Sequence, residues 1–214
     1  TPMLGEGAIY PIPDEDIMVD RFAIPSSFHR IVGIDFGIGH KFAAVWLAHD
    51  TDRDVIYVTD VWGKPDQQIS MNAGAIYQKG EWIPIAWPHD GHKRETQGGQ
   101  QLADLYKGHQ LNMLGISARY DDNKGGSQPT NPVIEEIFAR MYDGRFKVFA
   151  DLSDWFEEKR VYHRKDGIIV RRNDDIISAT HYAVMMKRYA STQIRQGPGS
   201  RTQTRHYDPL GGIR

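Results

Sequence analysis

Cysteine is absent from this sequence of 214 residues, which excludes disulfide bonds and thiolate metal sites. No apolar run reaches the roughly 18 residues that a membrane-spanning helix needs, and no signal-peptide pattern opens the chain. No Gly-x-x-x-x-Gly-Lys-Ser/Thr run occurs, and Gly37 and Gly39 lack the third glycine of a dinucleotide-binding fingerprint. The formal net charge is only −2, so overall charge by itself does not point to a nucleic-acid partner. We therefore expect a soluble, non-secreted protein without a membrane partner.

The composition that is present favours one folded domain with polar ends. Apolar residues make up 40% of the chain and charged residues 25%, which suffices for a sizeable core. Residues 1–29 are rich in proline and acids and show no period, so we expect a lead-in or linker there. From Lys187 to Arg214 six basic residues oppose the single acid Asp208. We expect residues 191–214 to form a basic, disordered arm.

Asp35 is the most informative residue, because it stands inside the apolar strand pattern of residues 31–36. Burying a carboxylate there is costly unless a partner compensates its charge, and a metal ion is the expected partner. The strand pattern resumes at 41–48 after a turn that contains Gly37 and Gly39. Glycine at these positions permits a close approach to the backbone.

The order of the predicted elements indicates an α/β fold. Strand-like runs at 30–36, 41–48 and 55–62 predict a three-stranded antiparallel meander. Helices and short strands alternate after it, which implies parallel pairing. Short strands are predicted at 82–88, 112–116 and 147–150. Helices are predicted at 67–78, at 100–109 and at 174–188. Another helix is predicted after the cap Asn131, with Pro132 as its first residue, and a helical turn is predicted around 155–156. Residues 117–130 form a polar loop, Asp166-Gly167 predicts a hairpin turn, and the buried stripe of the helix after Asn131 comprises Val133, Ile134, Ile137, Phe138 and Met141.

Acids occupy three positions in this order: Asp35 on the first strand, Asp90 after the fourth, and Asp174 and Asp175 at the start of the last helix. With the segments 34–37, 87–91 and 173–183 in this sequence, the chain resembles the ribonuclease H-like nucleases. Among them it resembles the C-terminal nuclease domain of the large terminase subunit of tailed bacteriophages, over about residues 29–190. The resemblance implies a mixed central sheet, with three antiparallel strands followed by parallel strands and helices on both sides.

The resemblance also implies a function, which is metal-dependent endonucleolytic cutting of concatemeric viral DNA during genome packaging into the capsid. Two divalent ions about 4 Å apart position a water and stabilise charge on the attacking and leaving oxygens. Mg²⁺ or Mn²⁺ takes carboxylate oxygens for this purpose. Asp35 is implied to bridge the two ions, with Asp90 on one side and Asp175 on the other. Cutting is expected to be independent of base sequence, since no base-reading motif is visible.

The third metal ligand is less well defined than the first two. Family members carry two polar positions three residues apart on the last helix, whereas Ser178-Ala179 occupies the second position here. We expect Asp175 to bind metal and Asp174 to be a second ligand or a helix-start charge. An acid before glycine is also an ordinary turn feature, and each nearby cation is equally explained as a solvated surface charge. The candidates for contact with substrate phosphate are Lys41, His92, Lys93 and His181.

A whole large terminase should also contain an ATPase motor, so the missing P-loop predicts that this chain is only the nuclease half. The start at Thr1 instead of methionine likewise suggests a fragment or a processed chain. Residues 1–29 would then connect to the motor, 30–190 would form the nuclease domain and 191–214 the arm. The implied partners are double-stranded DNA, the ATPase domain, the small terminase subunit and the portal protein. The isolated domain is expected to be monomeric and to act in the host cytoplasm.

Other interpretations stay open. A resolvase-like junction nuclease shares the fold but is normally a dimer. A docking module with the fold and no activity would show no metal-dependent change. A sugar-kinase or actin-like ATPase needs about twice this length. His89 and His92 around Asp90 form too small a set for a zinc site.

Overall fold

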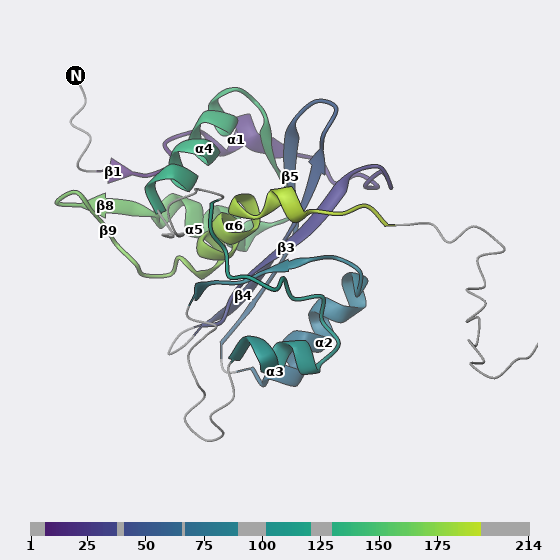
Figure 1. Ribbon diagram of the computed structural model, residues 1–214. Coiled ribbons are helices and arrows are strands. Elements are labelled where there is room, and N and C mark those ends of the chain that lie inside the picture. The colour runs from purple at the N-terminus through teal and green to yellow at the C-terminus, as the bar shows by residue number, and fades with distance from the viewer. Residues whose placement is uncertain (1–6, 38–40, 66, 90–101, 121–129, 194–214) are drawn as a thin grey trace, which may run out of the picture.

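The structure is a computed structural model that describes residues 7–37, 41–65, 67–89, 102–120 and 130–193. Its central feature is a mixed six-stranded sheet in the order β2-β7-β5-β4-β3-β6. Strands β3, β4 and β5 are antiparallel neighbours and run through the middle of the molecule (Figure 1), whereas β2 with β7, β5 with β7, and β3 with β6 pair in parallel. The strand bounds are Met18–Val19 (β2), His29–Asp35 (β3), Phe42–Asp50 (β4), Val55–Lys64 (β5), Ile85–Ala86 (β6) and Phe146–Phe149 (β7). The predicted antiparallel meander and mixed sheet are confirmed.

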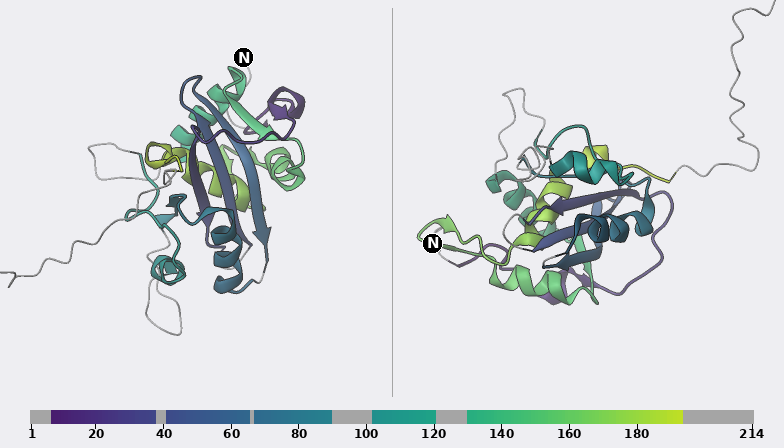
Figure 2. Two further views of the ribbon diagram at one scale, coloured as in Figure 1. Left: turned by 90° about the vertical axis from the view of Figure 1, so that its right-hand side faces the viewer. Right: turned by 90° about the horizontal axis from the view of Figure 1, so that it is seen from below.

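Helices cover both faces of the sheet (Figure 2) because successive strand residues point to opposite faces. On β3, Ile31 enters a core shared with α1, α4, α5 and α6, and the next residue, Val32, enters a second core shared with α2 and α3. The sheet therefore carries two apolar cores, which explains its almost continuous apolar sequence. The helix bounds are Asp14–Ile17 (α1), Ile69–Gly80 (α2), Leu102–Gly108 (α3), Thr130–Tyr142 (α4), Ser153–Val161 (α5) and Asp175–Met185 (α6).

A second, three-stranded sheet lies beside the first. It consists of β1 (Gly7–Ala8), β8 (His163–Lys165) and β9 (Ile168–Ile169) in the order β1-β8-β9. Asp166 and Gly167 turn the β8–β9 hairpin with φ values of 52° and 77°, the left-handed region that a two-residue hairpin turn of this kind needs. The predicted hairpin is confirmed. None of the described helices is long and apolar enough to cross a bilayer.

Several sequence-based expectations differ from the structure. The strand expected at 82–88 pairs with its neighbour over two residues only and is the short strand β6. The strand expected at 112–116 is reduced to a single bridge between Met113 and Ile85. Helix α4 begins at Thr130, before the expected cap. Phe138 is 37% exposed, so its predicted place in the buried stripe is wrong. The turn around 155–156 is a nine-residue helix, and the last helix ends at Met185, followed by the 3-10 helix η2 (Lys187–Tyr189).

The segment expected as a lead-in packs onto the domain from residue 7 onward. Tyr10 and Ile17 are buried in the first core, and β2 extends the main sheet beside β7. Asp14 binds Lys159 of α5, with 2.8 Å between Oδ1 and Nζ. The attachment of this segment to a motor domain stays a prediction, as does the domain boundary near residue 30. Residues 194–214, most of the expected arm, lie outside the described part of the chain.

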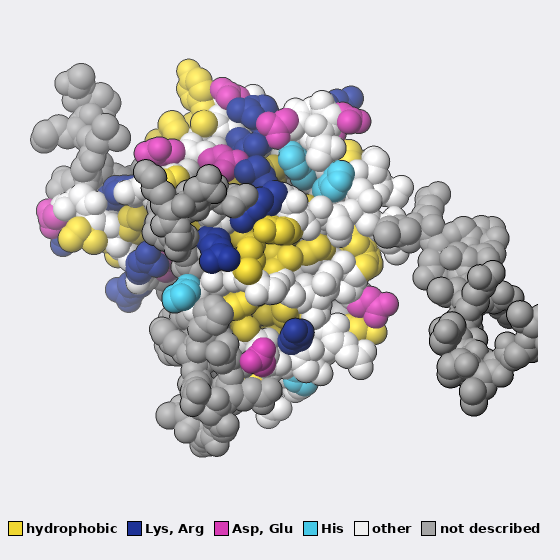
Figure 3. Space-filling model, viewed as in Figure 1, with side chains coloured by type: hydrophobic (Ala, Val, Ile, Leu, Met, Phe, Trp, Pro, Cys, Tyr) yellow, Lys and Arg dark blue, Asp and Glu magenta, His cyan; other side chains and the backbone are white. Residues whose placement is uncertain are grey.

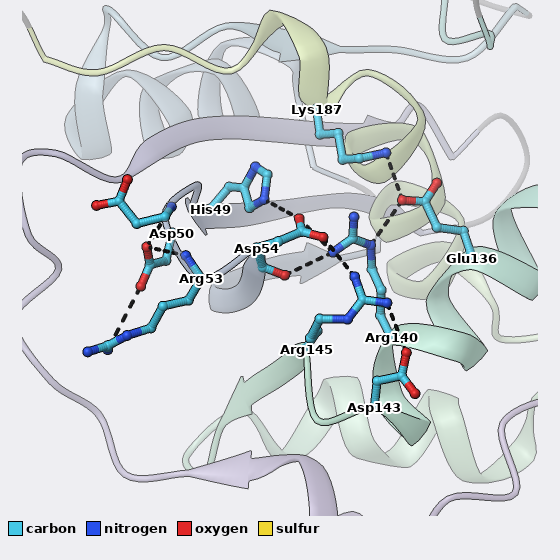
Figure 4. A network of polar contacts seen from close by, with 10 residues as sticks. His49, Asp50, Arg53, Asp54, Glu136, Arg140, Asp143, Arg145 and Lys187 are labelled. Carbon is cyan, nitrogen blue, oxygen red and sulfur yellow. Dashed lines mark hydrogen bonds and ion pairs between the residues drawn. The ribbon is translucent and has the colours of Figure 1, made fainter.

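A network of ion pairs joins α4 to the turn between β4 and β5. In Figure 3, Lys and Arg side chains gather on this face next to acidic ones, and Figure 4 shows how they connect. Asp54 accepts bonds from Arg140 and Arg145 at 3.0 and 2.7 Å, and Glu136 pairs with Arg140 and Lys187 at 3.0 and 2.7 Å. Asp54 has a pKa lowered to about 2, since the favourable bonds from His49, Arg140 and Arg145 outweigh burial, which acts in the opposite direction. These paired charges stabilise the turn.

Candidate active site

A hollow of about 680 Å³ opens where β3 ends and α6 begins. Among the described residues, six carboxylates line it, and so do three cations, Lys41, Arg171 and Arg172. The six acids are Asp35, Asp154, Glu157, Glu158, Asp174 and Asp175. Because like charges repel at close range, so many carboxylates in one hollow favour the binding of a cation.

Asp35 lies at the C-terminal end of β3, and the residue is only 9% exposed. Its Oδ1 accepts a hydrogen bond from the N–H of Gly37 at 3.1 Å. Gly37 has a φ of 62°, and a Cβ there would stand 2.4 Å from the carbonyl carbon of Lys41. Only glycine fits this turn without strain, as the sequence predicted for Gly37. Gly39 lies outside the described residues.

Close packing of α6 on β3 brings the second acid to the same hollow. A Cβ on Gly33 would stand 1.9 Å from the carbonyl oxygen of Ala179, so the helix and the strand touch backbone to backbone. Gly33 and Asp35 share one face of the strand, since side chains repeat every two residues. Asp175 precedes Ala179 by four residues, about one helical turn. The contact thus places Asp35 and Asp175 in the lining of the same hollow.

The two neighbouring acids of α6 differ in burial. Asp175, the first helical residue, is 7% exposed, whereas Asp174 at the N-cap position is half-buried and its side chain makes no capping hydrogen bond. Both line the hollow. The choice between them as a metal ligand stays a prediction.

Glu158 on α5 is a member of the site that sequence reasoning missed. Its Oε1 accepts a bond from Lys41 Nζ at 2.7 Å, and its Oε2 accepts the N–H groups of Ile176 and Ile177 at 2.7 and 3.2 Å. Burial raises the pKa of Glu158, although Lys41 and the two N–H groups act in the opposite direction. An acid on an amphipathic helix gives no local sign of such contacts.

Arg171 and Arg172 were missed as well, although only Asn173 separates them from Asp174 and Asp175 in the sequence. Both are exposed. Cations at the rim of an acidic hollow are well placed to meet a phosphate group.

The other predicted site residues fall into three groups. Lys41 lines the hollow. His181 does not; it is buried and its Nε2 lies 2.8 Å from Tyr10 Oη, and burial lowers its pKa to about 3. Its expected contact with phosphate has no support in this position. Asp90, His92 and Lys93 lie outside the described residues.

No group of three or more His, Asp or Glu side chains in the described ranges is close enough to hold a metal ion. A second hollow, of about 580 Å³, lies at the other end of β3, and its described lining includes His29, His49, Lys187 and Arg188 but no carboxylate. The acidic hollow is therefore the better candidate for a metal site, with Asp90 as the expected further ligand.

Comparison with known proteins identifies the family. Residues 32–187 match the model of the terminase RNaseH-like domain. The chain is 40% identical over 190 residues to the large terminase subunit of Salmonella phage P22, covering 88% of this chain and 38% of that protein. The chain thus spans well under half the length of this relative.

Two solved structures agree with this assignment. The structure of the P22 large terminase nuclease domain superimposes with a TM-score of 0.80 at 40% identity, covering 89% of this chain and 97% of that domain. The nuclease domain of the bacteriophage SPP1 large terminase, solved with bound Mn, superimposes with a TM-score of 0.57 at 18% identity, covering 82% and 99%; at that identity it supports the fold alone. The chain belongs to the family of terminase RNase H-like domains.

Proposed function

We propose that this chain is a divalent-metal-dependent DNA endonuclease that cuts concatemeric viral DNA during genome packaging. The observation that carries the proposal is the convergence of Asp35 and Asp175 on one acidic hollow, produced by the backbone contact between Gly33 and Ala179. Relatives in the same family support it, because the matched part of the P22 large terminase is a nuclease domain.

The donor set of the hollow fits Mg²⁺ or Mn²⁺. Its ligands would be carboxylate oxygens, which hard divalent ions prefer, and the SPP1 nuclease domain was solved with Mn. We propose Asp35 and Asp175 as ligands, Asp174 as an additional one, and Asp90 as the ligand from outside the described residues. Two bound ions would activate a water and stabilise charge on both oxygens of the scissile phosphate.

The remaining side chains would bind the substrate. Arg171 and Arg172 at the rim would contact backbone phosphates of double-stranded DNA. Lys41 would contribute to the same task, since an ammonium group carries three donors and the bond to Glu158 uses one of them. His92 and Lys93 stay candidates from the sequence. Because contacts to phosphate carry no information about the bases, we propose that cutting is independent of base sequence.

The wider setting follows from the family. We propose that the full protein carries an ATPase domain, works with the small terminase subunit and the portal protein, and acts in the host cytoplasm. The isolated domain is proposed to be monomeric.

The test is cleavage of supercoiled plasmid with Mg²⁺, Mn²⁺ or chelator. We expect metal-dependent cutting that Asp35→Asn and Asp175→Asn each reduce by more than about 100-fold, the scale on which losing one preorganised electrostatic group slows an enzyme. Asp143→Asn is the matched control, because Asp143 is an exposed acid paired with Arg145 outside the hollow. Asp174→Asn tests the role of Asp174 in the same assay. A loss of cutting as large as that of Asp35→Asn would indicate a metal ligand, and a small loss would indicate a helix-start charge.

Mn²⁺ binding to the same variants, measured by calorimetry, separates two causes of inactivity. Plasmid left intact by a chain that binds Mn²⁺ through Asp35 and Asp175 would mean that cutting requires the ATPase domain. An intact plasmid together with no Mn²⁺ binding would favour the alternative, a docking module without catalytic activity.

A further inference from the structure

The carboxylate of Glu158 connects three segments that are far apart in the sequence. Its Oε1 accepts a bond from Lys41, the residue before β4, and its Oε2 accepts the N–H groups of Ile176 and Ile177 in the first turn of α6. The residue is 5% exposed. Both oxygens are therefore occupied, and α5 is fastened to two segments that line the hollow.

The bonds to α6 replace an ordinary helix cap. The first N–H groups of a helix have no partner within the helix and need an outside acceptor. The N-cap residue usually supplies one, but the Asp174 side chain makes no capping hydrogen bond. Glu158 supplies the acceptor instead, from another helix. Since Ile176 directly follows Asp175, these bonds fix the backbone next to the expected metal ligand.

The bond to Lys41 fixes the other side of the hollow. Lys41 follows Asp35 and Gly37 in the sequence, and its side chain lies along Gly63 of β5. A Cβ on Gly63 would lie 3.4 Å from Lys41 Cε and 3.6 Å from Ile176 Cδ1, both within van der Waals contact. Glu158 thus holds the segment after Asp35 and the segment around Asp175 with one carboxylate.

We propose that Glu158 is a positioning residue that sets the separation of Asp35 and Asp175 by clamping the first turn of α6 and Lys41. The role rests on the proposed function, because its purpose is to shape the metal site. Residues that orient metal ligands without touching the metal typically change metal affinity by about 10- to 100-fold when they are replaced. Glu158 is expected to act on that scale.

The test uses the whole chain with Glu158→Ala and Glu158→Gln and reads two quantities. The first is Mn²⁺ affinity by calorimetry, for which Glu158→Ala should bind at least about 10-fold more weakly. Glu158→Gln keeps a carbonyl oxygen for the two N–H groups and should lose clearly less. The second is hydrogen exchange of the Ile176 and Ile177 amides in the metal-free protein, which should accelerate at least about 10-fold in Glu158→Ala because both amides lose their acceptor.

Glu136→Ala is the matched control. Glu136 is a half-buried acid on a helix and holds two cations, Arg140 and Lys187, in the network outside the hollow (Figure 4). Its replacement should lower the melting temperature but leave Mn²⁺ affinity and the two amides unchanged. A general loss of stability is thereby separated from a loss of positioning.

Three outcomes would overturn the inference. The first is an Mn²⁺ affinity of Glu158→Ala within twofold of that of the unaltered chain. The second is an Mn²⁺ affinity of Glu158→Gln as low as that of Glu158→Ala, because this result would make Glu158 a direct ligand. The third is an unchanged rate of hydrogen exchange at the Ile176 and Ile177 amides in Glu158→Ala, which would refute the clamp itself. If the unaltered chain binds no Mn²⁺ at millimolar concentration, the proposed metal site fails, whereas faster exchange in Glu158→Ala still upholds the clamp.

Discussion

Gly33→Ala is the substitution that most directly tests the contact between β3 and α6. The added Cβ would stand 1.9 Å from the Ala179 carbonyl oxygen, 2.8 Å from the Ala183 nitrogen and 2.9 Å from the Ala183 Cβ. Real Cβ atoms do not approach other atoms this closely, and two of the three neighbours are backbone atoms that cannot rotate away. The helix must therefore move off the strand.

The magnitude follows from the cost of overpacking. Extra carbon atoms forced into a well-packed core cost about 1–3 kcal/mol, and occasionally more. A backbone clash belongs at the upper end, so we expect the free energy of unfolding to fall by about 3 kcal/mol. In a chain of this size, 1 kcal/mol corresponds to roughly 2–4 °C in melting temperature, which gives a decrease of about 6–12 °C. Because α6 carries Asp175, Mn²⁺ affinity should fall as well.

The assay is thermal and urea unfolding, with Mn²⁺ titration at a temperature where the variant is folded. Gly74→Ala in α2 is the matched control, since a Cβ there would meet nothing within 4 Å. It should stabilise the protein by about 0.5–1 kcal/mol, the helix preference of alanine over glycine. A Gly33→Ala protein that melts within 2 °C of the unaltered chain, with the same Mn²⁺ affinity, would refute the reasoning.

Two further predictions concern pH and DNA. Burial lowers the pKa of His181 to about 3 in the folded protein, whereas the pKa of an unfolded histidine is near 6.5. Between these two pH values the ring binds a proton only in the unfolded chain. The free energy of unfolding therefore falls as the pH decreases from 6.5 toward 3, by about 2 kcal/mol at pH 5. In urea unfolding at pH 7 and pH 5, His181→Gln should lose about 2 kcal/mol less than the unaltered chain, and equal losses would contradict the assignment. Replacing Arg171 and Arg172 by Gln should weaken binding to double-stranded DNA and reduce the slope of log affinity against log salt by about 0.9 per lost phosphate contact. Arg53→Gln is the control, because it alters an 80% exposed side chain paired with Asp50, and it should leave the slope unchanged. If the unaltered chain, the double variant and Arg53→Gln all gave the same slope, Arg171 and Arg172 would be excluded from the DNA contact.

The features that the sequence predicted well are those with a local cause. Alternating apolar residues and tight turns produce the three-stranded meander, and Gly37 is needed because its φ of 62° brings the backbone of Lys41 close. Asp35 was identified because an acid is unusual within an apolar strand. Its place in an acidic hollow agrees with that reasoning, although its role as a metal ligand stays a prediction.

The features that the sequence did not predict depend on distant contacts. Glu158 acts through Lys41, 117 residues away, and through the backbone of α6, so no pattern around residue 158 indicates its role. The two-residue strand β2 is too short to show a period, and it exists because β7 offers it a partner. His181 illustrates the reverse error, because a helical position near the acids did not reveal that its ring turns to Tyr10.

The pairing of β2 with β7 has a consequence for the order in which the protein assembles on the ribosome. Met18 aligns with Val148, so the partner strand does not exist until roughly 130 further residues have been synthesised, about 6–26 s at ordinary rates of translation. Strands β3, β4 and β5 need no such wait, because their partners follow directly in the sequence. During that interval the apolar side chains of Tyr10 and Ile17 lack the core that later covers them. The earliest part of this segment to be made is thus among the last to be secured.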